Sequence, residues 1–276
     1  MPSDERWHPA RPAKLQTVDV AISFEVLGFA AAAPLQCACP SYLVSDGTTS
    51  VLLDCGPGAI ERLWRCGQIA QLDAIVVSHM HADHVLDLVL LAGELVQSMF
   101  EGRRPKLFVP QGHGQSVLAR LDSALAGEPK GKTRFDGVFE VHGYQADERL
   151  SVGALSFTFA PTEHAQPCFA TRITDGRRVI VYGADGGPSH ALVDLARDAG
   201  LLVLEATYLD DEQAASAQGH MTAGQAGELA ARAHASRLLL THTIAGTPEA
   251  DLLGLAAQSY AGPIALAREG YRYEIS

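Results

Sequence analysis

The chain has 276 residues, of which 47% are hydrophobic and 19% charged, so it can bury a sizeable core and does not have the composition of a disordered protein. The formal net charge of −11 argues against a general polyanion-binding surface, which would need excess positive charge. No stretch is apolar and long enough for a signal peptide or a membrane span, so we expect a cytoplasmic protein.

The first half of the chain is predicted to alternate strands with short helices. Residues 1–16 are polar and rich in proline and are expected to form a flexible leader, followed by a single domain over residues 17–276. Alternating apolar residues from Val18 to Val26 predict the first strand. Residues 127–137 are expected to be a loop. Further strands are predicted over 42–44, 50–54, 73–77 and 106–109, and helices over 59–65, 85–95 and 115–125.

The second half continues the alternation with more strands. A helix over 222–235 begins with Thr222 and Gln225, which form a capping box. Because no proline- or serine-rich linker interrupts the chain, we expect one α/β (α+β) domain of two packed sheets with helices outside. The remaining strands are predicted near 138–143, 154–160, 168–174, 178–183, 201–205, 237–241, 263–266 and 271–275, and the remaining helices over 188–197 and 248–259.

Cysteines and basic residues leave alternatives open. The five cysteines are an odd, scattered set, which does not indicate a disulfide framework. We interpret Cys37 and Cys39 as small packed thiols, with a metal site as the alternative. Two basic clusters are interpreted as solvated loops, with anion-binding patches as the alternative. They comprise Arg103, Arg104 and Lys106, and then Lys130, Lys132 and Arg134.

The segment from His79 to His84 holds four residues of the types that bind metals. Because alternate side chains of an extended stretch point the same way, His79 and His81 can face one metal together. Asp83 and His84 fall where the next helix begins, so they leave in another direction and can face a second metal. Imidazole and carboxylate groups suit zinc, and also manganese or iron. The alternative for this segment alone is a surface histidine tract.

Three more ligand-type residues each follow a predicted strand. His164 comes after 154–160, Asp185 after 178–182 and His242 after 237–241. Functional groups in layered α/β proteins often gather at such strand ends. The pattern therefore favours a dinuclear metal site over a histidine tract.

His220 and Glu205 are candidates for proton transfer. His220 lies directly before the capped helix, and the helix N-terminus is expected to lower the pKa of its imidazole. Glu205 ends the strand over 201–205 at the same expected edge. We interpret His220 as the proton donor to a leaving group and Glu205 as the residue that orients it. The alternatives are a helix-cap histidine and a structural carboxylate.

Together these residues resemble the metallo-β-lactamase superfamily, whose pattern is His-x-His-x-Asp-His, then a distant His, a bridging Asp and a last His. The resemblance covers about residues 18–276 and is closest to the short bacterial hydrolases of the RNase Z-like branch. The segments that carry it are 52–56, 163–164, 167–170, 205–208, 219–222, 239–242 and 265–270.

The resemblance implies a four-layer αββα sandwich with two divalent metal ions at one edge of the sheets, zinc being the expected metal and manganese or iron the alternatives. It also implies proton transfer by residues matching Glu205 and His220, and a homodimer. Asp83 is assigned a catalytic role as well as a ligand role. The implied ligands are His79, His81 and His164 for one metal, Asp83, His84 and His242 for the other, and Asp185 as the bridge.

Three departures argue against the tRNA 3′ processing of RNase Z. The chain has no long arm rich in glycine and proline, Ala82 stands where those enzymes usually carry Gly, and residues 28–34 read GFAAAAP where they have a Thr-Gly-Gly type of loop. RNA binding needs many phosphate contacts, and the sequence offers few. We therefore expect a small-molecule substrate, with tRNA 3′ processing as the less favoured alternative.

The preferred hypothesis is hydrolysis of a small phosphodiester by a hydroxide that bridges the two metals, with His220 protonating the departing oxygen. A second hypothesis keeps the enzyme class but changes the bond to an ester, thioester or lactone. A third is a metal-dependent binding protein without catalysis. The complete ligand set favours an enzyme.

Overall fold

The computed structural model describes residues 21–93, 98–126, 134–209 and 219–275. The predicted leader over residues 1–16, the start of the loop predicted over 127–137, and Lys130 and Lys132 lie outside the described residues. In the described ranges, no helix combines the length and the apolarity needed to cross a membrane.

The first sheet has seven strands in the order β14-β1-β2-β3-β4-β5-β6. Strands β3 to β6 run parallel to one another, whereas β14, β1 and β2 are added antiparallel. The strands are β1 (Ile22–Gly28), β2 (Ser41–Ser45), β3 (Ser50–Leu53), β4 (Ala74–Val76), β5 (Lys106–Pro110), β6 (Glu140–Tyr144) and β14 (Arg272–Ile275).

The second sheet also has seven strands, in the order β13-β12-β11-β10-β9-β8-β7. Strands β10 to β13 are parallel. Because β8 and β10 both pair antiparallel with β9, strands β8, β10, β11 and β12 all point the same way. The strands are β7 (Arg149–Val152), β8 (Leu155–Pro161), β9 (Phe169–Thr174), β10 (Val179–Tyr182), β11 (Leu201–Glu205), β12 (Leu238–Thr241) and β13 (Ile264–Leu266).

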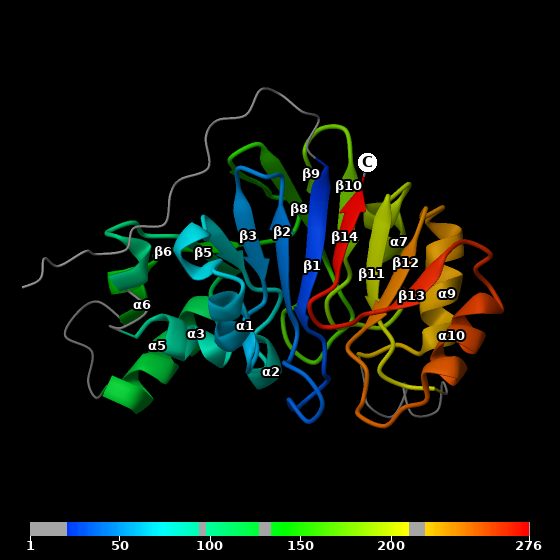
Figure 1. The fold of residues 1–276 in the computed structure, drawn as a ribbon, viewed down its shortest axis with the longest axis horizontal. Helices are drawn as coiled ribbons and strands as arrows, with labels where there is room; N and C mark the ends of the chain where they lie inside the picture. Colours follow the sequence, from blue (N-terminus) through cyan, green and yellow to red (C-terminus); the bar gives the residue numbers. More distant parts are fainter. Residues whose placement is uncertain (1–20, 94–97, 127–133, 210–218, 276) are drawn as a thin grey trace, which may run out of the picture.

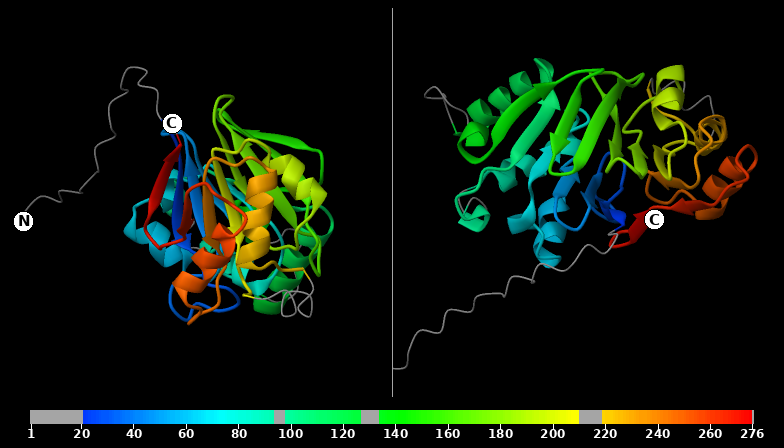
Figure 2. Two further views of the ribbon diagram at one scale, coloured as in Figure 1. Left: turned by 90° about the vertical axis from the view of Figure 1, so that its right-hand side faces the viewer. Right: turned by 90° about the horizontal axis from the view of Figure 1, so that it is seen from above.

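Helices lie on the outer faces of both sheets (Figure 1). Beside the first sheet are α1 (Ala59–Arg65), α2 (Ala82–Val85), α3 (Asp87–Leu91), α5 (His113–Ala126), α6 (Arg134–Val138) and the short 3₁₀ turns η1 (Ile69–Gln71) and η2 (Ser98–Phe100). Beside the second sheet are α7 (His190–Ala196), α9 (Ala223–Arg232) and α10 (Glu249–Ala257). The turned views in Figure 2 show the two sheets stacked between these helices.

Strand alternation explains the four layers. Val51 and Leu53 of β3 point into the core between the sheets, whereas Leu52 points out to the helices. On β11, Val203 faces the shared core and Leu202 faces the helices of the second sheet. Strands β3 and β11 thus carry apolar residues on both faces, because both faces are covered there. The predicted αββα sandwich is confirmed.

Most predicted elements are found within two residues of their expected ends, but three predictions were wrong. Residues within the predicted loop 127–137 form helix α6, in which Phe135 and Val138 are buried one helical turn apart. Strand β7, a short edge strand, was not predicted. The single helix predicted over 85–95 is instead the pair α2 and α3, which meet at Leu86. Leu95 lies outside the described residues.

Candidate metal centre

Strand ends from both sheets bring the candidate ligands to one edge of the sandwich. Strand β4 leads into His79, while β8, β10 and β12 of the second sheet lead into His164, Asp185 and His242. His242 has a backbone φ of 49°, and Ala184, directly before Asp185, has one of 55°. This left-handed backbone is uncommon for residues with a side chain, and it turns the chain sharply at the strand end.

One group of potential ligand atoms is formed by His79, His81, His164 and Asp185. The Nδ1 atom of His81 lies 3.0 Å from Nε2 of His79 and 3.0 Å from Nε2 of His164. The Oδ2 atom of Asp185 lies 3.7 Å from Nε2 of His79. Four tetrahedral zinc ligands are spaced by roughly 3.3 Å, so these separations are those of atoms around one ion.

A second group is formed by Asp83, His84 and His242. The Oδ2 atom of Asp83 lies 3.4 Å from Nε2 of His242 and 3.9 Å from Nε2 of His84. Asp185 joins the two groups, because its Oδ1 lies 3.4 Å from His84 Nε2 and its Oδ2 lies 3.4 Å from His242 Nε2. The structure thus brings all seven predicted ligands into two adjoining groups.

Hydrogen bonds fix which ring nitrogen faces the first group. Nδ1 of His164 lies 2.8 Å from the carbonyl oxygen of Gly219, which can only accept, so Nδ1 carries the proton. Nδ1 of His79 lies 3.0 Å from the hydroxyl of Ser78, and that hydroxyl donates to Asp54. The Ser78 oxygen therefore accepts from His79. In both rings, Nδ1 is the donor and Nε2 is the nitrogen that faces the group.

The second group follows the same rule. Nδ1 of His84 lies 2.8 Å from the buried carboxylate of Asp54. Nδ1 of His242 lies 2.9 Å from the hydroxyl of Thr207, which donates to Glu205. Both rings are therefore held with Nε2 towards the centre. Histidines that bind metals are held in this way by a partner on the other nitrogen.

The converging lone pairs fit divalent cations. The Nε2 atoms of His84 and His242 and the carboxylate oxygens of Asp83 and Asp185 converge to 3.4–3.9 Å, and a cation between them would offset the charge of the two carboxylates. Among the described residues, two buried side-chain atoms have no hydrogen-bond partner, and these are His84 Nε2 and Asp185 Oδ1, both in the centre. A buried polar atom without a partner is costly, and a bound ion would satisfy both. The set of imidazoles and carboxylates suits zinc, manganese or iron.

The electrostatics of the centre follow from burial and from its carboxylates. Burial holds the pKa of His79 well below its ordinary value, which keeps the ring neutral and able to bind a metal. Burial also lowers the pKa of His84, but the charges of Asp185 and Asp54 outweigh it and raise the pKa well above the ordinary value. Without a metal, these carboxylates favour the protonated ring, and a bound cation would compete with that proton.

His220 and Glu205 form a pair beside the two groups. Nδ1 of His220 lies 3.1 Å from both carboxylate oxygens of Glu205 and 3.9 Å from Oδ2 of Asp185. The prediction that the helix N-terminus lowers the pKa of His220 was wrong. Burial lowers this pKa, but the hydrogen bond to Glu205 and its charge outweigh burial and raise it. Thr222, two residues on, caps the helix instead.

A cavity of about 350 Å³ opens over the centre. His81, Asp83, Asp185, His220 and His242 line its floor. The rest of its wall consists of Ala31, Ala32, Ala82, Thr207, Tyr208 and Ile244. The alanine-rich loop predicted at residues 28–34 therefore does reach the site. A substrate in this cavity would contact both metal groups and the candidate proton donor.

Two functional residues had no role assigned from the sequence. Asp54, which directly follows β3, is fully buried and also accepts hydrogen bonds from the backbone N–H of Ser78 and the hydroxyl of Tyr182. Thr207 connects Glu205 to a ligand. A signal existed for Asp54, because it is a carboxylate at the end of an apolar strand that neighbours the strand leading to His79.

The cysteines and the basic clusters lie outside the centre. No candidate metal group among the described residues contains a cysteine. Burial, followed by the charge of Asp83, raises the pKa of Cys39 to about 12, which fits a packed thiol. Arg103 contacts the carbonyl of Ala70, and Arg104 donates to backbone carbonyls near α6, so both have structural partners.

Comparison with known proteins agrees with this site. Residues 49–243 match the family described as Beta-lactamase superfamily domain. The Bacillus subtilis protein named "Probable metallo-hydrolase YhfI" is 32% identical over 233 residues, covering 84% of this chain and 91% of that protein. The crystal structure of YhfI superposes with a TM-score of 0.81 at 27% identity, covering 92% of this chain and 99% of that one. Ribonuclease Z of Myxococcus xanthus is 27% identical, covering 82% of this chain and 88% of that protein.

The architecture and the site define a protein of the metallo-β-lactamase fold. The chain belongs to the β-lactamase superfamily, and the resemblance to its RNase Z-like members is confirmed. This membership, with the two groups of ligand-type residues, supports metal-dependent hydrolase activity.

Proposed function

We propose that the protein hydrolyses a small phosphodiester with two divalent metal ions, zinc being the first candidate. The observation that carries the proposal is the pair of His220 and Glu205, in which Nδ1 of His220 lies 3.1 Å from both carboxylate oxygens of Glu205 and 3.9 Å from Oδ2 of Asp185. An alkoxide leaving group needs a proton as it departs, and a protonated imidazole supplies one. Kinship with a protein named ribonuclease Z also supports cleavage of a phosphodiester.

The metal ions would be held by the two groups described above and bridged by Asp185. When bound, such ions lower the pKa of water and withdraw charge from the phosphoryl group under attack. Asp83 is held in place for this task, since its Oδ2 accepts a hydrogen bond of 2.9 Å from the backbone N–H of Ala32. In its catalytic role, Asp83 would therefore bind a cation and also position Ala32 in the wall of the cavity.

His220 would protonate the leaving oxygen. Because its Nδ1 faces Glu205, Nε2 is the nitrogen left to meet a substrate in the cavity. Glu205 is fixed in turn by the backbone N–H of Gly186, 2.7 Å away, and by the hydroxyl of Thr207. A carboxylate with three partners moves little, so it orients the His220 ring and stabilises its positive charge.

The test is a comparison of leaving groups on protein of known metal content. The substrates are bis(p-nitrophenyl) phosphate, whose phenolate leaves readily, and a cyclic nucleotide, whose alkoxide does not. His220→Ala should lower kcat by about 100-fold or more for the cyclic nucleotide and by clearly less for the aryl diester.

Two control variants accompany this comparison. His81→Ala should abolish both activities, and His190→Ala, an exposed histidine on α7, should change neither. Wild-type protein that hydrolyses thioesters, lactones or carboxylic esters but no phosphodiester would overturn the proposal in favour of carbonyl chemistry. Protein that is fully loaded with metal but hydrolyses no class of substrate would indicate a metal-dependent binding protein.

A further inference from the structure

We infer that the substrate brings one anionic group to the metal centre and is otherwise uncharged, with a flat apolar ester group that packs against Ala31, Ala32, Tyr208 and Ile244. The inference rests on the proposed function, because it takes a phosphodiester as the group that meets the metal ions. It adds the chemical class of the parts of the substrate that do not react.

The wall of the cavity is apolar on the side away from the ligands. Ala31, Ala32 and Ala82 present methyl groups, and Ile244 is 42% exposed although it is a large hydrophobic residue. The ring of Tyr208 lies edge-on to that of His220, with centroids 6.0 Å apart. The apolar wall therefore reaches the proton donor, which is where a leaving group would lie. Aromatic and aliphatic walls of this kind bind flat rings.

Positive side chains are lacking from the chain segments that build the site. The described lining contains neither lysine nor arginine. The sequence gives the same result, because the stretches that hold the lining residues contain neither lysine nor arginine. Segments free of lysine and arginine are 28–61, 66–102, 150–171, 179–196, 198–231 and 238–267.

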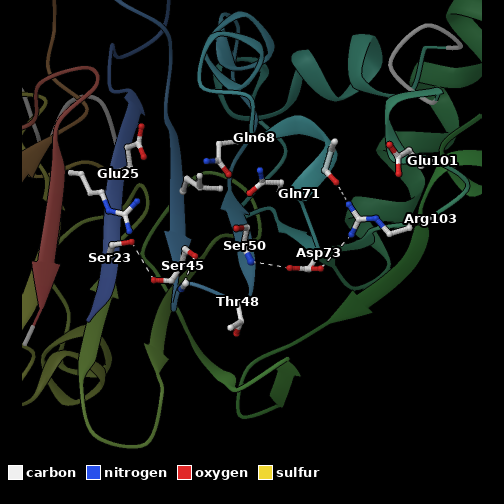
Figure 3. A pocket seen from close by; sticks show the side chains of 14 residues that line it. Ser23, Glu25, Ser45, Thr48, Ser50, Gln68, Gln71, Asp73, Glu101 and Arg103 are labelled. Atoms are coloured by element: carbon white, nitrogen blue, oxygen red, sulfur yellow. Dashed lines mark hydrogen bonds and ion pairs between the residues drawn. The ribbon is translucent and has the colours of Figure 1, made fainter. Parts of the chain in front are cut away.

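The lack of lysine and arginine is particular to this cavity, because two larger hollows of the protein are each lined by at least one arginine. A hollow of about 470 Å³ over the outer face of β1, β2 and β3 has Arg103 and Arg272 in its lining (Figure 3). There Arg103 pairs with Asp73 across 3.5 Å. Another of about 640 Å³ beside α9 has Arg232. Over the metal centre, a second phosphate or carboxylate would meet no cation besides the metals and would lose hydration without compensation.

The wall is held in place before any substrate binds. The N–H of Ala31 donates to the carbonyl of Thr243 at 3.2 Å, and the N–H of Ala32 donates to Asp83 at 2.9 Å. Ala30 and Thr243 also form a bridge between the two loops. Because the loops on either side of the centre are tied together, a ring that packs there need not order them, which favours selectivity.

The first experiment measures binding and does not require turnover. Phenylphosphonate and methylphosphonate differ in the ring and carry the same charge once both are fully ionised, so both are titrated calorimetrically into zinc-loaded protein at a pH where each is a dianion. We expect phenylphosphonate to bind about tenfold more tightly. Ile244→Ala should remove most of this difference and leave methylphosphonate unchanged, while Leu125→Ala, an exposed residue of α5, should alter neither.

Equal binding of the two phosphonates by the wild-type protein would overturn the inference. So would an Ile244→Ala variant that weakens both ligands alike, since the side chain would then act on the centre as a whole. Because these outcomes are read without hydrolysis, they stay distinct from a failure of the proposed function.

The second experiment tests the charge rule with a matched pair of substrates. The p-nitrophenyl ester of thymidine 5′-phosphate is compared with the same compound carrying a 3′-phosphate. The added phosphate should lower kcat/KM by about tenfold or more, and Ile244→Arg should reverse part of that loss. An unchanged or higher kcat/KM for the 3′-phosphorylated compound would refute the inference, even if both compounds are hydrolysed.

Discussion

Substitution of Asp54 by Asn should separate the role of its charge from that of its size. The carboxylate is fully buried and accepts four hydrogen bonds, of which three, from Ser78 Oγ, His84 Nδ1 and Tyr182 OH, reach the same oxygen, Oδ2. An asparagine has one accepting oxygen and one NH₂ group, so either the backbone N–H of Ser78 or the three donors at Oδ2 lose an acceptor.

The magnitude follows from these contacts. A hydrogen bond to a charged group contributes about 1.5–3 kcal/mol, and a buried donor left unpaired adds a penalty of similar size. We therefore expect Asp54→Asn to lower the free energy of unfolding of the metal-free protein by about 3–5 kcal/mol. Because His84 loses the partner that fixes its tautomer, zinc affinity should also fall by about 10–100-fold.

Urea unfolding with a chelator present measures the first quantity, and competition with a chromogenic chelator measures the second. Asp194→Asn is the matched control, since its side chain is 70% exposed, and it should change stability by no more than about 0.5 kcal/mol. A loss below about 1 kcal/mol, or unchanged zinc affinity in a folded variant, would refute the role given to Asp54.

Three further predictions concern a hydroxyl, a turn and the metals. Thr207→Val should weaken zinc binding at His242 by about tenfold, whereas Thr207→Ser, which keeps the hydroxyl, should stay within about threefold in the same competition assay. Burial raises the pKa of Asp175, but the backbone N–H groups of Arg178 and Arg177 outweigh it and hold the pKa below 3.8. The ionised Asp175 therefore stabilises the folded protein at pH values above its ordinary pKa, and this stabilisation is lost as the pH falls through its lower pKa in the folded state. Asp175→Asn should lower the free energy of unfolding by about 0.5–1 kcal/mol at neutral pH. The difference should shrink below about pH 4 in urea unfolding, and a constant difference would contradict this reasoning. Chelation should lower the Tm, and zinc restored to 100 times its Kd should add about 2.7 kcal/mol for each occupied site, while an unaltered Tm would argue against metal binding.

Much of the fold was predictable because both faces of most strands are buried. Continuous apolar runs such as residues 201–204 and 238–240 mark central strands whichever way they pair. Strand β7 escaped prediction because it lies at a sheet edge and its exposed residues, Arg149 and Ser151, carry no apolar signal. Helix α6 escaped because it has five residues, too few for a period to show.

The ligand set was predictable from residue type and position, and the structure brings its members together. Their roles as metal ligands, and the homodimer, stay predictions. The state of His220 was not predictable from its place before a helix. Its pKa depends on Glu205, fifteen residues away in sequence but 3.1 Å away in space, and a direct contact with a charge outweighs a helix dipole.

The division of ligands between the two sheets has a consequence for how the protein comes apart. His79, His81, Asp83 and His84 follow a strand of the first sheet, and His164, Asp185 and His242 follow strands of the second. Ions bound among them would cross-link the two sheets, as a disulfide cross-links distant parts of a chain. Loss of the ions would leave apolar packing and a few hydrogen bonds between the sheets, such as that from Tyr182 to Asp54, to resist opening. Opening would expose Phe24, Phe157 and the rest of the inner faces to water, so loss of bound metal would favour aggregation as well as loss of the proposed activity.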